Sequence, residues 1–277
     1  MEDQMLQAAQ DRLLEKRDLL KKTTKEPQSK ISTGLRMTTC HKHGEYEAKI
    51  IELFGEERAS QCPACLVERE RLEEEVKTRE LEIWRKEKIE IFLKQSRVPK
   101  RFNGKTLEGF KPGDAKQRKI LKVIEKYLEK LIDGACGSLI MCGRPGTGKT
   151  HLACAVIEQF IKATGKPAGY KTIYEMIQMV KDTYRKDSEE TETEAIGRNI
   201  GVPFLVIDEV GVQFGTETEK LILYQVINGR YEEKLPTVLI SNLTQEELIS
   251  FIGERAFDRL KEDGGAVLAF DWGSYRR

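Results

Sequence analysis

The amino-acid sequence predicts an α/β fold in which a mainly parallel β-sheet is flanked by helices. Short apolar runs alternate with helical stretches from residue 97 onward. One apolar run leads directly into a glycine-rich loop, and a later one ends in two adjacent carboxylates. Parallel strands are joined by helical crossovers and are buried on both faces, so this alternation is typical of the fold class.

The expected elements follow one another in a regular order. The predicted strands lie at 138–142, 168–170, 204–207, 237–241 and 266–270. The predicted helices begin near Thr150, cover 173–184 and 221–231, and resume after Thr244. Thr244 and Glu247 have the spacing of a capping box, which satisfies free backbone N–H groups at a helix start.

A phosphate-binding loop is predicted between the first strand and the first helix of this region. The segment 143–150 fits the pattern G-x-x-x-x-G-K-[ST] at every position and lies between an apolar run and a helix, as the motif requires. The glycines allow backbone N–H groups to approach an anion. The candidate ATP-binding residues are Gly143, Arg144, Pro145, Gly146, Thr147, Gly148, Lys149 and Thr150, with His151 directly after them.

Each side chain at the end of this loop and of the later strands has an expected role in hydrolysis. Lys149 is expected to reach the β- and γ-phosphates, and Thr150 to ligate Mg²⁺. Asp208 and Glu209 follow a buried strand; Asp208 is expected to hold the Mg²⁺ through water and Glu209 to polarise the attacking water. Asn242 ends the next strand and is expected to orient that water, although Asn is also common in turns.

A metal site is predicted near the N-terminus. Cys40 and His43 form one C-x-x-H pair, and Cys62 and Cys65 form a C-x-x-C pair. Three thiolates and one imidazole make a tetrahedral, structural Zn²⁺ site. His41 is an alternative nitrogen ligand with poorer spacing, and a set of unliganded cysteines is the competing interpretation.

The composition limits location and partners. The 277 residues include 47 Lys and Arg and 46 Asp and Glu, so any contact with nucleic acid requires a local basic patch. No run approaches the roughly 18 apolar residues of a membrane helix, and the first twenty residues lack an apolar signal core. We therefore expect a cytoplasmic protein with no membrane partner and no disulfides.

Changes in composition divide the chain into four expected segments. They are an N-terminal helix and linker at 1–37, a zinc-ribbon-like module at 38–66, a charged helical linker at 67–96 and the ATPase domain at 97–277. The charge run of the linker is typical of a solvated spacer helix, and a short coiled coil is the alternative.

Two arginines near the C-terminus lie four residues apart, on one face of a predicted helix. Arg259 follows Arg255 in the segment 253–260. A guanidinium donated across a subunit boundary stabilises a transferring phosphoryl group. From spacing alone, however, a surface ion pair with Glu254 or Asp258 is the better interpretation.

Several segments together resemble the DnaC-type helicase loaders, which are AAA+ ATPases. They are GRPGTGKTHLA, MVKDTYR, LVIDEVGVQ, LPTVLISNL, GERAFDRL and FDWGSYRR, within about 97–277. The resemblance implies an AAA+ fold, a slow ATPase regulated by its partners, and self-association through nucleotide-bridged interfaces. It also implies that a DnaB-type replicative helicase and single-stranded DNA are the partners, with the N-terminal region docking the helicase.

The resemblance assigns roles to further residues. Arg259 matches an arginine finger that acts on a neighbour's ATP, and Arg276 matches a sensor arginine that touches nucleotide. The segment 173–185 matches a helix that grips single-stranded DNA, and an ordinary amphipathic helix is the equal alternative. The candidate DNA contacts are Lys181, Tyr184 and Arg185.

Two other functions compete with helicase loading. The IstB-type regulators of transposition share the AAA+ core, although the C-terminal segment fits the DnaC type better. The other is a zinc-containing DNA-binding module that holds nucleotide without hydrolysing it. Glu209, Asn242 and Arg259 argue against such an inactive site.

Overall fold

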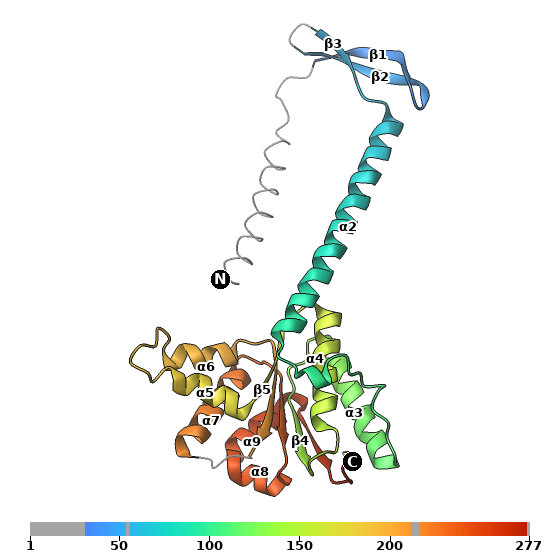
Figure 1. Ribbon diagram of the computed structural model, residues 1–277. Helices are drawn as coiled ribbons and strands as arrows, with labels where there is room; N and C mark the ends of the chain where they lie inside the picture. Colours follow the sequence, from blue (N-terminus) through green and yellow to red (C-terminus); the bar gives the residue numbers. More distant parts are fainter. Residues whose placement is uncertain (1–30, 54–55, 212–215, 276–277) are drawn as a thin grey trace. The chain divides into compact units, whose positions relative to one another are not determined.

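The computed structural model describes residues 31–53, 56–211 and 216–275, and it divides between Leu81 and Glu82 into two compact units (Figure 1). The candidate helix at 1–20 lies outside the described residues. Within the described residues, no helix has the length and apolar character needed to cross a membrane.

The N-terminal unit contains a small antiparallel sheet with the strand order β1-β2-β3. The strands are β1 (Ile31–Cys40), β2 (Gly44–Leu53) and β3 (Glu56–Ala59). A tight turn joins the first two strands, and Gly44 adopts a φ of 78° there, a conformation that favours glycine. Among the described residues of this unit, the buried apolar side chains are those of Ala48, Ile50 and Cys62.

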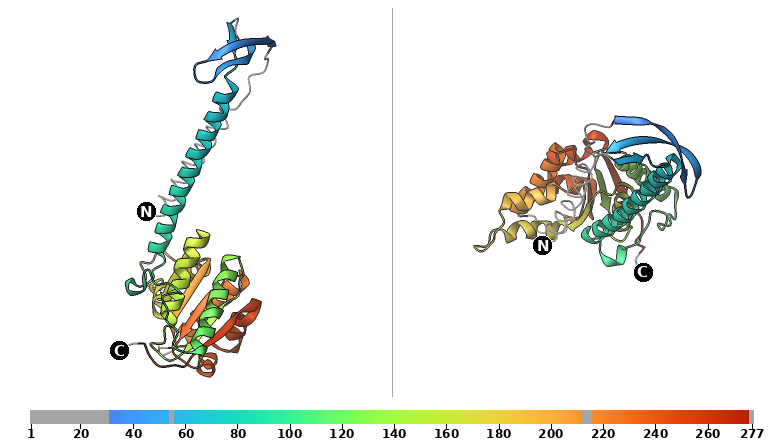
Figure 2. Two further views of the ribbon diagram at one scale, coloured as in Figure 1. Left: turned by 90° about the vertical axis from the view of Figure 1, so that its right-hand side faces the viewer. Right: turned by 90° about the horizontal axis from the view of Figure 1, so that it is seen from above.

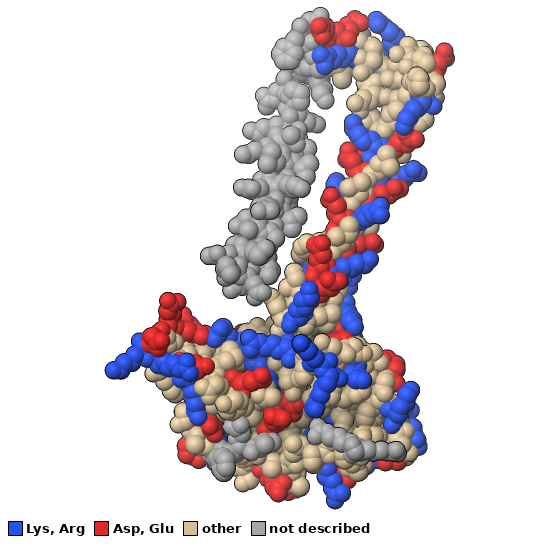
Figure 3. Space-filling view, in the orientation of Figure 1, with Lys and Arg blue, Asp and Glu red and all other residues tan. Residues whose placement is uncertain are grey.

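A long helix, α2 (Pro63–Gln95), follows the sheet. It begins at Pro63 rather than at 67, because proline suits the first turn of a helix, where its missing N–H is not needed. None of its residues is buried, and ion pairs such as Arg69–Glu73 lie along its surface. Figure 3 shows acidic and basic side chains interspersed along this helix.

The second unit contains a sheet of five parallel strands in the order β5-β6-β7-β4-β8, which confirms the predicted fold class. The strands are β4 (Leu139–Gly143), β5 (Ala168–Thr172), β6 (Phe204–Val210), β7 (Thr237–Ser241) and β8 (Ala266–Phe270). Parallel strands end at one edge of a sheet, so the residues that follow β4, β6 and β7 lie along the same edge.

Helices cover both faces of this sheet (Figure 2). The helices are α3 (Ala115–Ile132), α4 (Lys149–Thr164), α5 (Ile173–Asp182), α6 (Glu192–Ile200), α7 (Glu217–Glu232), α8 (Gln245–Ile252) and α9 (Glu254–Lys261), with short 3₁₀ turns η1 (Lys100–Phe102) and η2 (Glu262–Gly264). One hydrophobic cluster lies under α3 and α4, and a second lies under α5 to α9. Strand residues alternate between the clusters: Met141 faces the first and Ile140 the second.

Two helices, α3 and α6, were not predicted from the sequence. Asp114 caps α3 by accepting a hydrogen bond from the backbone N–H of Gln117. The other helix, α6, begins with a capping box between Thr191 and Glu194, so both helices carry a recognisable start signal. The signals were present, but neither segment adjoins a phosphate-site motif.

A buried arginine on α7 joins three parts of the second unit. The Arg230 side chain is fully buried and donates five hydrogen bonds of 2.6–3.2 Å. Its acceptors are the Thr237 hydroxyl and the carbonyls of Asn199, Ile200, Val202 and Pro236. This arginine therefore satisfies carbonyl groups at the end of α6 and before β7 that would otherwise be buried without a donor.

Candidate nucleotide and metal sites

The predicted phosphate-binding loop connects β4 to α4, with Lys149 as the first residue of the helix. Gly148 precedes the helix with a φ of 97°, a left-handed conformation. A Cβ at Gly148 would lie 2.8 Å from the Phe110 ring, so this glycine is required both by its conformation and by its close neighbour. The loop thus brings the N-terminus of α4, with its free N–H groups, to the sheet edge.

Thr150 and Asp208 meet directly at this edge. The Thr150 hydroxyl donates to Asp208 Oδ2 over 2.8 Å, and the backbone N–H of Glu209 donates to Asp208 Oδ1 over 2.7 Å. Asp208 is buried. A hydroxyl and a carboxylate are hard oxygen donors of the kind that Mg²⁺ binds beside nucleotide phosphates, so these residues fit that ion.

Glu209 has an unusual backbone conformation beside this pair. Its φ is 61°, and the pairing register between β6 and β7 shifts between Ile207 and Val210. The shift leaves the Glu209 side chain exposed at the sheet edge, while Asp208 and Val210 on either side are buried. Left-handed conformations of non-glycine residues cost free energy and concentrate at functional sites.

Lys149 and Asn242 complete the predicted set at this edge. Lys149 is buried, and its Nζ donates to the carbonyls of Gly143 and Arg144, each over 2.7 Å. Asn242 directly follows β7 and is exposed. The fold therefore brings the loop, the Asp208–Glu209 pair and Asn242 to one edge, while Lys149 contacts carbonyls of its own loop.

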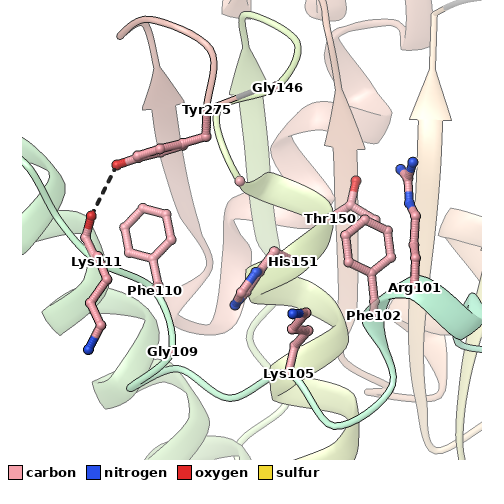
Figure 4. A pocket seen from close by; sticks show the side chains of 11 residues that line it. Arg101, Phe102, Lys105, Gly109, Phe110, Lys111, Gly146, Thr150, His151 and Tyr275 are labelled. Carbon is pink, nitrogen blue, oxygen red and sulfur yellow. Dashed lines mark hydrogen bonds between the residues drawn. The ribbon is translucent and has the colours of Figure 1, made fainter. Parts of the chain in front are cut away.

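A pocket of about 470 Å³ opens beside the loop (Figure 4). Its lining includes the loop residues Gly146, Gly148 and Thr150, followed by His151. The lining also includes Gly109, the aromatic side chains of Phe102, Phe110 and Tyr275, and the cations Arg101, Lys105 and Lys111. An apolar pocket edged by cations and adjoining a phosphate loop can accommodate the base and ribose of a nucleotide.

The segment that follows β8 forms hydrogen bonds with backbone carbonyls of the phosphate loop. The backbone N–H of Tyr275 donates to the Gly146 carbonyl over 2.8 Å, and the Trp272 indole donates to the Thr147 carbonyl over 3.2 Å. The Tyr275 ring also meets Phe110 edge to face, with centroids 5.6 Å apart. Because these donors occupy loop carbonyls, they favour a loop conformation that leaves its N–H groups for an anion.

Phe110, Trp272 and Tyr275 were not among the residues predicted from the sequence for this site. Only the resemblance of the C-terminal segment drew attention to the last two residues. Phe110 carries no motif and reaches the loop through tertiary packing alone. The predicted sensor, Arg276, lies outside the described residues.

Arg259 lies at the opposite edge of the sheet. It shares a small pocket with Ser138, which precedes β4, and with Thr237, which begins β7. Its guanidinium donates to the Tyr224 hydroxyl over 2.8 Å and lies 5.5 Å from the Tyr231 ring centroid. The surface ion pair expected from spacing alone is not among the ion pairs of the described residues.

The candidate DNA contacts lie at the end of α5 and in the turn that follows it. Lys181 forms a 2.9 Å ion pair with Glu219, and Arg185 forms one of 2.9 Å with Asp182. The side chain of Tyr184 is half exposed. Both cations therefore already have carboxylate partners, whereas the Tyr184 ring is open to a ligand.

The four predicted zinc ligands converge in the N-terminal unit. The ligand atoms of Cys40, His43, Cys62 and Cys65 all lie within 4.8 Å of one another. The sulfur atoms of Cys40 and Cys65 are 3.5 Å apart, close to the roughly 3.8 Å expected for two thiolates on one tetrahedral Zn²⁺. His41 is not in this group, so the alternative nitrogen ligand is not supported.

The surroundings of this cluster favour metal binding. His43 turns its Nδ1 atom toward the sulfurs, 3.3 Å from that of Cys65, while its Nε2 atom lies 3.6 Å from a Glu68 carboxylate oxygen. A carboxylate behind a histidine ligand fixes its orientation at metal sites. The backbone N–H groups of Lys42 and His43 lower the pKa of the Cys40 thiol to about 6, whereas the hydrogen bond with Cys40 raises the pKa of the Cys65 thiol to about 11, so Cys40 is the first of this pair to become a thiolate.

The parallel sheet, the phosphate-loop motif and the Thr150–Asp208 pair define the AAA+ class of ATP-binding proteins. Residues 56–263 match the family described as IstB-like ATP binding protein. The replicative helicase loader DnaC of Buchnera aphidicola subsp. Schizaphis graminum is 33% identical over 190 residues, which cover 69% of this chain and 76% of that protein. The chain belongs to the DnaC/IstB-like family of AAA+ ATPases.

Other comparisons agree with this assignment. The replicative helicase loader DnaC of Escherichia coli (strain K12) is 36% identical over 160 residues, 58% of this chain, and the chain spans 64% of that protein's length. A crystal structure of the DnaC helicase loader matches 62% of this chain and 100% of its own, with a TM-score of 0.56 and 21% identity. The crystal structure of DnaI matches 65% and 95%, with a TM-score of 0.52 and 18% identity. At these identities the two structures show the fold alone.

Proposed function

We propose that this protein is an ATP-dependent loader that places a DnaB-type replicative helicase on single-stranded DNA. The observation that carries the proposal is the similarity to DnaC helicase loaders, at 33–36% identity over 160 to 190 residues. The complete set of phosphate-loop and strand-end residues at one sheet edge supports the ATPase part of it. Residues 97–277 then form the ATPase domain, 67–96 the linker and 38–66 the zinc module.

Each residue of the site has its own role in ATP hydrolysis. The loop from Gly143 to Thr150 holds the phosphates through its backbone N–H groups, and Lys149 turns from its loop carbonyls to the β- and γ-phosphates. Thr150 and, through water, Asp208 would hold a Mg²⁺ ion, which would neutralise phosphate charge. Glu209, exposed beside Asp208, polarises the attacking water, and Asn242 orients it.

Arg259 acts on the ATP of a neighbouring subunit. Its place at the edge of the sheet opposite the phosphate loop supports a role in trans rather than in its own site. An arginine finger supplied by a neighbour raises the hydrolysis rate by about 10³- to 10⁵-fold in other phosphoryl-transfer proteins. Hydrolysis therefore requires self-association, and the energy released changes conformation rather than a small substrate.

The N-terminal unit supplies the helicase contact, and its zinc is structural. Four protein ligands close the coordination sphere, so the ion holds the sheet and takes no part in hydrolysis. DNA contact involves the end of α5 and the turn after it, where Lys181 and Arg185 exchange carboxylate partners for phosphates and Tyr184 stacks on a base. Because each cation must give up an ion pair, its net contribution to the free energy of DNA binding is small, and the predicted DNA affinity is modest.

The first experiment is native mass spectrometry of the purified protein with a DnaB-type helicase, in the presence of ATP, ADP or no nucleotide. A defined helicase–loader assembly that depends on ATP is the expected result, and the same masses report one zinc per chain. The failure of the two proteins to associate in every nucleotide state would overturn helicase loading. Assembly on duplex DNA instead would favour an IstB-type regulator of transposition, the second candidate, which the matched family description supports.

The second experiment tests Arg259 by mixing two inactive variants. Lys149→Ala removes nucleotide contact, and Arg259→Ala removes the finger. In a mixture, a Lys149→Ala subunit supplies its arginine to the intact site of an Arg259→Ala subunit, so part of the wild-type ATPase rate returns. The matched control mixes Arg259→Ala with the double variant and stays inactive. A wild-type rate for Arg259→Ala alone would contradict the assignment, and Tyr224→Phe shows whether loss of the Tyr224 bond matters by itself.

A further inference from the structure

The Asp208 carboxylate has a partner outside the phosphate loop. The phenol of Tyr170 on β5 donates a hydrogen bond of 2.8 Å to Asp208 Oδ2. Tyr170 is 7% exposed, and its own backbone N–H is fixed by the Ser96 carbonyl at 2.7 Å. Neither its sequence context nor any motif marks this tyrosine as part of the site.

Strand register explains how Tyr170 reaches the carboxylate. Tyr170 pairs with Val206 on the neighbouring strand β6, and both side chains belong to the hydrophobic cluster under α4. Side chains alternate along a strand, so Asp208 lies on the same face two residues further on. The phenol spans this diagonal and reaches the carboxylate oxygen that also accepts from Thr150.

Asp208 accepts hydrogen bonds from one group that would also bind a metal ion and from two groups that would not. Oδ1 accepts from the Glu209 backbone, and Oδ2 accepts from both the Thr150 hydroxyl and the Tyr170 phenol. The Thr150 hydroxyl is the group that a Mg²⁺ ion would take as its own ligand.

We propose that Tyr170 is a positioning residue for Mg²⁺, because its phenol holds the Asp208 carboxylate in place when Thr150 turns to the metal. The inference rests on the proposed ATP–Mg²⁺ site. Without the phenol, the Glu209 N–H alone would restrain the carboxylate, which could then rotate about its bond to Cβ. Loss of such an outer partner reduces metal affinity about 10- to 100-fold at other metal sites.

Tyr170→Phe tests the hydroxyl while keeping the ring in the hydrophobic cluster. The measurement is binding of a fluorescent ATP analogue as a function of Mg²⁺ concentration, without hydrolysis as the readout. The Mg²⁺ concentration for half-maximal binding is expected to rise about 10-fold. Binding in EDTA is expected to be unchanged, which a general loss of packing would not give.

Two comparisons make the test specific. Tyr127→Phe is the matched control, because the Tyr127 hydroxyl is also buried but has no hydrogen-bond partner among the described residues. In an Asp208→Asn background, Tyr170→Phe is expected to add nothing, since the two residues act through one bond.

The outcomes separate this inference from the proposed function. Wild-type protein that binds the analogue with Mg²⁺ dependence, together with an unchanged Tyr170→Phe curve, overturns the role of Tyr170 alone. A loss of binding that is equal with and without Mg²⁺ also overturns it. Wild-type protein that does not bind the analogue at all overturns the ATP site and this inference with it.

Discussion

Each of the two units of the chain is stabilised internally in a different way. In the ATPase unit, hydrophobic clusters fill both sides of a five-stranded sheet. In the described part of the N-terminal unit, buried apolar side chains are few, and the four convergent ligands Cys40, His43, Cys62 and Cys65 take the place of a core. Small domains bury too little apolar surface to be stable alone, so the comparison predicts that one unit depends on metal and the other does not.

The largest expected effect is on the N-terminal sheet. Cys65→Ser, or treatment with a strong chelator, removes a ligand set whose binding energy is also folding energy, so this unit is expected to unfold. The measurement combines zinc content with hydrogen exchange, in which backbone amides of β1 and β2 should lose their protection. ATP-analogue binding by the second unit is expected to be unchanged.

Cys136→Ser is the control, because Cys136 lies in the ATPase unit outside the ligand group. It should keep both the zinc and the protection of β1 and β2. Retention of a protected sheet in zinc-free protein would show that the unit has a sufficient core of its own, and the contrast between the units would then be lost.

A large effect is expected in the ATPase unit from Arg230→Ala. The change leaves four backbone carbonyls and the Thr237 hydroxyl without their donor. A buried polar group left without its hydrogen-bond partner costs about 1–3 kcal/mol, so the free energy of unfolding is expected to fall by several kcal/mol. Denaturant titration of the ATPase unit measures it, and the zinc content should not change.

Arg198→Ala is the matched control for this substitution. Arg198 also lies near the end of α6, but its pair with Glu190 is exposed, so an effect within about 0.5 kcal/mol is expected. Equal effects of the two substitutions would mean that the buried hydrogen bonds of Arg230 contribute no more than a surface pair.

The smallest expected effect concerns the pair of Lys181 and Glu219. The hydrogen bond from Lys181 lowers the pKa of Glu219, so its stabilisation is complete above the unfolded pKa of about 4.3 and is lost as the pH falls below it. Lys181→Met is expected to cost less than about 1 kcal/mol at pH 7, because this pair is partly exposed.

The pH dependence distinguishes this pair from general surface effects. Thermal melts of wild type and Lys181→Met should differ by a constant amount between pH 6 and 8 and converge below about pH 4. Lys220→Met removes a pair with the highly exposed Glu217 and should show no such dependence. A difference that persists at low pH would rule out the ion pair as its cause.

Local sequence patterns predicted the elements that carry the candidate site. Apolar runs placed all five strands of the parallel sheet, because buried strands repeat the same composition. The spacing of the two Cys/His pairs predicted a cluster that the structure contains. In both cases the information lies within a few adjacent residues.

Contacts between distant segments could not be predicted in this way. Tyr170 reaches Asp208 only because β5 and β6 pair in one register, and Phe110 reaches Gly148 only after the preceding segment packs against α4. Arg230 was not predicted as a buried group because its acceptors are backbone carbonyls, which have no sequence signature. The catalytic roles of the site residues and the zinc itself remain predictions.

The order of strands in the sheet also determines when the nucleotide site can form during synthesis. The strand that leads into the phosphate loop, β4, lies between β7 and β8, which are synthesised after the other three strands of this sheet. The segment after β8 then supplies the donors that hold the loop carbonyls. A nascent chain that stops before β8 therefore lacks one of the two neighbours of β4 and the support for the loop, so we expect the nucleotide site to form only after β8 has been synthesised.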